Sequence, residues 1–123
     1  MRLAHVDIGG KSYPAAFTLR VLANLEERVP GKSAIDALDD MLAAGFVSDT
    51  VWLLAQLLAA GAKVADSGTD APTERELLDG LGIDDLHAVT AAVLRSVHTV
   101  EPEIRLKKKT LLPRIFRAGK VLG

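Results

Sequence analysis

The stretch that decides the fold covers residues 51–65 and reads VWLLAQLLAAGAKVA. Gln56 and Lys63 are its only strongly polar side chains, so a helix over these residues has almost no polar face and must be buried. Such a helix is about 22 Å long, which is short of the ~30 Å hydrocarbon core of a membrane. We therefore predict that it forms the centre of a small soluble helical bundle, with the only tryptophan, Trp52, packed inward.

Composition limits the kinds of chemistry that the chain can carry. With 123 residues it fits one domain, and with aromatics at only 4% its core must be aliphatic. The absence of cysteine excludes a disulfide framework, a thiolate nucleophile and a cysteine-based zinc site. All 16 acidic residues precede residue 104, whereas residues 104–123 carry seven Lys/Arg. The sequence thus predicts an acidic body, residues 1–103, and a basic tail, residues 104–123.

The first 17 residues predict a β-hairpin. Apolar and polar residues alternate from Ala4 to Ile8, and Gly9-Gly10 is a two-residue turn of the type that hairpins require. This turn places Val6 opposite Tyr13 on one face. Because an isolated hairpin is marginal in water, we expect this one to pack on the helices.

Start and stop signals predict the helices. Thr18 and Ser33 each precede a segment with helical apolar spacing, residues 19–29 and 34–44, and Gly45 closes the second.

Similar signals mark the start of the central helix and of the two helices that follow it. Ser48 and Asp49 supply start chemistry for the central helix. Residues 73–76, TERE, have the form of a capping box that opens a short helix. Residues 84–85, two aspartates, introduce a last body helix that Pro102 stops.

These elements predict a mainly α fold, a small bundle of about five helices with an N-terminal β-hairpin packed on it. The core is predicted from apolar residues that recur on one side of each element. The predicted core residues are Val6, Tyr13, Phe17, Leu22, Leu25, Leu38, Leu42, Trp52, Leu54, Leu58, Leu77, Leu86, Val89, Val93 and Val97.

The tail reads IRLKKKTLLPRIFRAGKVLG and predicts a short amphipathic helix after Thr110, with an apolar stripe flanked by cations. We interpret it as a docking peptide for a protein partner or for the acidic body; a solvated end and a nucleic-acid or membrane-surface contact are the alternatives. The predicted partner-binding residues of the tail are Leu111, Leu112, Arg114, Ile115, Phe116, Arg117 and Lys120.

No residue pattern predicts catalysis, a metal or a cofactor. His87 and His98 would lie about 16 Å apart along one helix, too far to share a metal ion. Residues 9–12, GGKS, lack the first glycine of a phosphate-binding loop and precede a strand instead of a helix. The acidic clusters fit solvated helix faces and helix starts. We expect a protein that is not an enzyme.

The order of several short motifs resembles the tail assembly chaperones of long-tailed bacteriophages and related gene-transfer particles. Residues 6–13, VDIGGKSY, resemble the hairpin turn of that family, and Phe17-Thr18 followed by a Leu25-Glu26-Glu27 helix is similar to its first helix. The similarity continues more loosely through the Trp52 helix and residues 73–78, so it covers roughly residues 4–100.

The resemblance implies a small, mostly helical, non-enzymatic protein of the host cytoplasm that is not expected in the mature virion. It also implies two partners: the tape-measure protein, which it keeps soluble, and the tail-tube protein, which assembles around the tape measure. A homo-oligomer is a further possible state. No membrane insertion is expected.

Two other classes stay open. One is a structural part of the particle, such as a head-tail connector or a minor tail protein, which purified virions would contain. The other is a basic-tailed nucleic-acid adaptor, which is disfavoured because the acidic body would repel a phosphate backbone.

Overall fold

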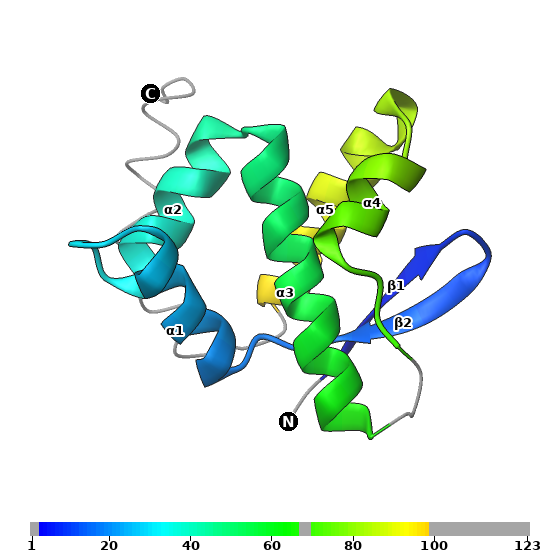
Figure 1. Cartoon of the computed structure of the whole chain (residues 1–123), viewed down its shortest axis with the longest axis horizontal. Coiled ribbons are helices and arrows are strands. Elements are labelled where there is room, and N and C mark those ends of the chain that lie inside the picture. The colour runs from blue at the N-terminus through cyan, green and yellow to red at the C-terminus, as the bar shows by residue number, and fades with distance from the viewer. Residues whose placement is uncertain (1–2, 67–69, 99–123) are drawn as a thin grey trace.

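The computed structural model describes residues 3–66 and 70–98, and Figure 1 shows their arrangement. Within these residues the fold is a small helical bundle with an N-terminal antiparallel β-hairpin, as predicted. The elements in chain order are β1 (Ala4–Ile8), β2 (Lys11–Ala15), α1 (Leu19–Arg28), α2 (Ala34–Ala44), α3 (Val47–Ala65), α4 (Glu74–Gly80), the 3-10 turn η1 (Ile83–Asp85) and α5 (Leu86–His98).

The hairpin has the predicted register. Val6 pairs with Tyr13, and the two strands are joined by Gly9 and Gly10, which have φ angles of +57° and +82°. Positive φ at both turn positions is the backbone of a type I′ turn, whose twist matches that of the strands. The hairpin packs on the helices through both of its strands, β1 against α5 and β2 against α3.

Three of the predicted helix starts are confirmed by their hydrogen bonds. The Thr18 hydroxyl accepts from the Val21 amide at 3.4 Å, and the Ser33 hydroxyl accepts from the Asp36 amide at 3.2 Å. The third start is the capping box of α4.

In that box the Thr73 hydroxyl accepts from the Glu76 amide, while the Glu76 carboxylate accepts from the Thr73 amide at 2.9 Å. These bonds satisfy amides that a helix start would otherwise leave without partners.

The start predicted for α3 is wrong. The helix begins at Val47, and its N-cap is Phe46, which offers no side-chain cap. The reason lies in the preceding residue: Gly45 closes α2 in the left-handed conformation at φ +69°, and the chain turns directly into α3. Ser48 therefore lies inside the first turn of the helix and does not precede it.

Helix α3 is the centre of the fold. It contacts β2, α1, α2, α4 and α5, and Figure 1 shows it between the α1–α2 pair and the hairpin with α4 and α5. Buried residues occupy most positions from Thr50 to Gly61, in agreement with the nearly continuous apolar sequence. In the part of the chain that the structure describes, no helix is long and apolar enough to cross a membrane.

Helix α3 and strand β2 approach each other closely at Gly61. A β-carbon at this glycine would collide with the carbonyl group of Pro14 and lie 2.6 Å from Ala15 Cα. Just beyond the strand, the Ala16 amide donates a hydrogen bond of 3.0 Å to the Leu57 carbonyl of α3. The backbone of α3 therefore packs directly on the backbone of β2 at Gly61, an approach that only a glycine permits.

Most of the predicted core is buried. These residues are Val6, Phe17, Leu25, Leu38, Leu54, Leu58, Leu77, Val89, Val93 and Val97. Tyr13, Leu22 and Leu42 are half-buried and pack against this core.

Trp52 is also half-buried and packs against this core, whereas Leu86 is half-buried at the surface and departs from the prediction. Trp52 lies at the edge of the core because its side of α3 faces α1: the Arg28 guanidinium is 4.6 Å from the centre of the Trp52 ring. One turn further along α3, Gln56 accepts a 2.6 Å hydrogen bond from Asn24 of α1. Leu86 is the first residue of α5 and lines a groove at the surface.

Candidate protein-binding groove

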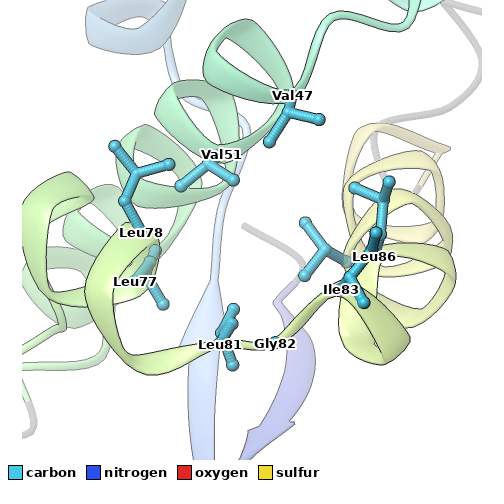
Figure 2. A pocket seen from close by; sticks show the side chains of 9 residues that line it. Val47, Val51, Leu77, Leu78, Leu81, Gly82, Ile83 and Leu86 are labelled. Carbon is cyan, nitrogen blue, oxygen red and sulfur yellow. The ribbon is translucent and has the colours of Figure 1, made fainter.

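An apolar groove opens between α3, α4 and the start of α5. Its volume is about 210 Å³, below the range of roughly 300 to 1,000 Å³ that is usual for small-molecule sites. Figure 2 shows side chains of the three elements around this space. The lining residues are Val47, Val51, Leu77, Leu78, Leu81, Gly82, Ile83, Leu86 and Val89.

The groove has a buried floor and an exposed apolar rim. Val51, Leu77 and Val89 form the floor and belong to the core of the fold. On the rim, Ile83 is 91% exposed and Leu78 is 45% exposed. Large aliphatic side chains at such exposure around a shared hollow are typical of a surface that another apolar surface covers.

The local sequence explains why the rim is exposed. Adjacent residues in a helix point about 100° apart, so Leu77 enters the core of the fold while Leu78 faces the opening. Helix α4 ends at Gly80, and Leu81 then adopts an extended backbone. The extended residue leads into η1, where Ile83 lies at the surface.

Two aspartates, Asp84 and Asp85, lie beside Gly82, one of the lining residues of the groove. The Asp85 carboxylate accepts from the Gly82 amide at 2.8 Å, and a β-carbon placed on Gly82 would lie 2.8 Å from Asp84 Oδ1. Residues 70–85 contain six acids and one base, Arg75. The site therefore combines an apolar floor with two aspartates beside it, which favours an apolar segment that carries a cation next to its apolar side chains.

A second hollow lies between α1, α2 and the start of α3, beside Phe46, which is 65% exposed. Its lining includes Arg28, Asp40 and Asp49. Arg28 and Asp49 form an ion pair of 2.8 Å. Because charged groups contribute much of this lining, it suits an apolar partner less well than the groove does.

The described residues contain no group of three or more histidines or carboxylates placed to hold a metal ion. His5 and His87 are exposed and lie on different elements, β1 and α5.

The structure describes the groove residues but not the predicted tail site. The predicted tail residues, Leu111, Leu112, Arg114, Ile115, Phe116, Arg117 and Lys120, lie outside the described residues. Val47, Leu78 and Ile83 of the groove rim were not predicted as site residues. The sequence carries a local signal for the exposure of two of them. Leu77 and Leu78 are adjacent, so they cannot share one helix face, and Ile83 is followed by two aspartates.

In comparisons with known proteins, no family model, no curated protein and no solved structure matches the chain.

Proposed function

We propose that this chain is a non-enzymatic tail assembly chaperone, whose groove binds apolar helical segments of a tape-measure protein in the host cytoplasm. The proposal combines the sequence resemblance with one structural observation, the exposed apolar rim of Leu78 and Ile83 over a buried apolar floor. Helix-in-groove binding places apolar side chains at helical spacing into such a hollow.

The chemistry of the groove suits a chaperone that must release its client. Fully burying a large aliphatic side chain contributes about 1.5 to 3 kcal/mol, so the rim offers several kcal/mol before the ordering costs of binding. This supports a modest and reversible affinity. A tape-measure protein exposes apolar helix faces until tail-tube subunits enclose it, and an acidic, well-solvated carrier keeps it from aggregating.

The experiment is co-expression with the tape-measure protein encoded in the same genome. We expect the soluble fraction of that protein to rise at least fivefold when this chain is present, and the two to co-purify. An unrelated acidic helical protein of similar size, expressed at the same level, controls for nonspecific effects of co-expression.

Purified particles separate the chaperone from a structural component. A chaperone leaves before the tail is complete, so mass spectrometry of finished particles should detect no stoichiometric amount of this chain. An unchanged soluble fraction of the tape measure, or one copy or more of this chain per particle, would contradict the proposal.

A further inference from the structure

We propose that the groove has an occupant within the same chain: the apolar stripe of residues 111–116 docks on it when no partner is bound, so that the tail competes with the client. The docking is a property of this chain alone. Only its regulatory meaning, competition for the groove, rests on the proposed function.

The chemistry of the two surfaces is complementary. The groove offers an apolar floor and rim, and the stripe offers four large apolar side chains within six residues, Leu111, Leu112, Ile115 and Phe116. Asp84 and Asp85 lie beside Gly82 of the groove, and residues 104–123 carry seven cations and no acid. The match is therefore both apolar and electrostatic, and the charges add orientation more than affinity.

The connection is long enough. Helix α5 ends at His98, and the groove lies at the other end of this helix, beside Leu86 and Val89. The 13 residues of α5 span about 20 Å, whereas residues 99–110 reach roughly 40 Å when extended. The stripe can thus return to the groove of its own chain without any rearrangement of the body.

Intramolecular attachment makes a weak contact effective. A segment joined by a short linker experiences an effective concentration on the order of mM, so it occupies the groove even with modest affinity. A client helix must then displace the stripe, which lowers the apparent client affinity in proportion to the occupied fraction. Contacts that the groove would otherwise make with unrelated apolar segments are suppressed in the same way.

The test uses disulfide trapping in the full chain, which has no natural cysteine. An Asp84→Cys/Arg114→Cys variant places one thiol on the groove border and one beside the stripe, and keeps every apolar side chain. An Arg20→Cys/Arg114→Cys variant is the matched control, because Arg20 is also an exposed charged residue near a helix start but lies on α1, across α3 from the groove.

We expect dilute oxidation to close an intramolecular disulfide at least tenfold faster in the Asp84 pair than in the Arg20 pair, without any client present. Adding Leu112→Asp and Phe116→Asp to the Asp84 pair should reduce its rate to that of the control.

Equal rates for the two pairs, or a fast rate that the aspartates leave unchanged, would overturn the proposal. A covalent dimer as the main product would show that the tail docks on a second copy instead. Since no tape-measure protein takes part, failure here and failure of the chaperone proposal are distinguishable.

Discussion

A Gly61→Ala substitution is expected to destabilise the fold by about 3 kcal/mol, the upper part of the usual range for overpacking. The added methyl group would overlap the Pro14 carbonyl and lie 2.6 Å from Ala15 Cα, and neither is a side chain that could rotate away. The hairpin must therefore move away from α3 at this point, which also strains the Ala16 to Leu57 hydrogen bond. The gain in helix propensity of up to about 1 kcal/mol offsets only part of this cost.

Chemical denaturation followed by circular dichroism measures the effect, and Gly80→Ala provides the matched control. Gly80 is also a helical glycine, but a β-carbon there would meet no atom within 4 Å. We expect that variant to be as stable as the parent or up to about 1 kcal/mol more stable. If both alanine variants were equally stable, the close packing of β2 on α3 would be wrong.

A Leu78→Asp/Ile83→Asp variant is expected to lose at least nine-tenths of the soluble tape-measure protein that the parent chain recovers on co-expression. Both side chains are exposed on the groove rim, so two carboxylates there should leave the fold intact while a client helix would have to bury them. The measurement is the amount of client in the soluble fraction and in the co-purified complex.

Leu19→Asp is the control for that variant. Leu19 is 82% exposed on α1, away from the groove, so its substitution removes an exposed apolar side chain without touching the site. Full client recovery by the groove variant, or equal loss by the control, would show that the client binds elsewhere on the chain.

Local sequence signals predicted much of the fold because they act over a few residues. The Gly9-Gly10 turn sets the hairpin register, and Thr18, Ser33 and Thr73 cap their helices as expected. The partial exposure of Trp52 has a nonlocal reason. Its burial depends on where α1 lies across α3, and helical periodicity in α3 does not contain that information.

The same limit explains why the groove was not predicted. Two of its three floor residues, Leu77 and Val89, are core residues that the pattern of apolar spacing identified. Its opening depends on the short length of α4 and on the extended backbone at Leu81, after which Ile83 lies at the surface. Gly61 is similar: a glycine inside an apolar helix is ordinary in the sequence, and its role follows from the approach of a strand that lies far away along the chain.

Site-specific photo-crosslinking tests most directly whether the groove is the client site. A photoreactive phenylalanine analogue would replace Ile83 in one variant and Leu19 in another, each co-expressed with the tape-measure protein. We predict a covalent adduct with the tape measure from position 83 and little or none from position 19, with the crosslinked peptide falling in an apolar helical segment of the client. Adducts from position 19 alone, or from neither position while the two proteins still co-purify, would contradict the assignment of the groove.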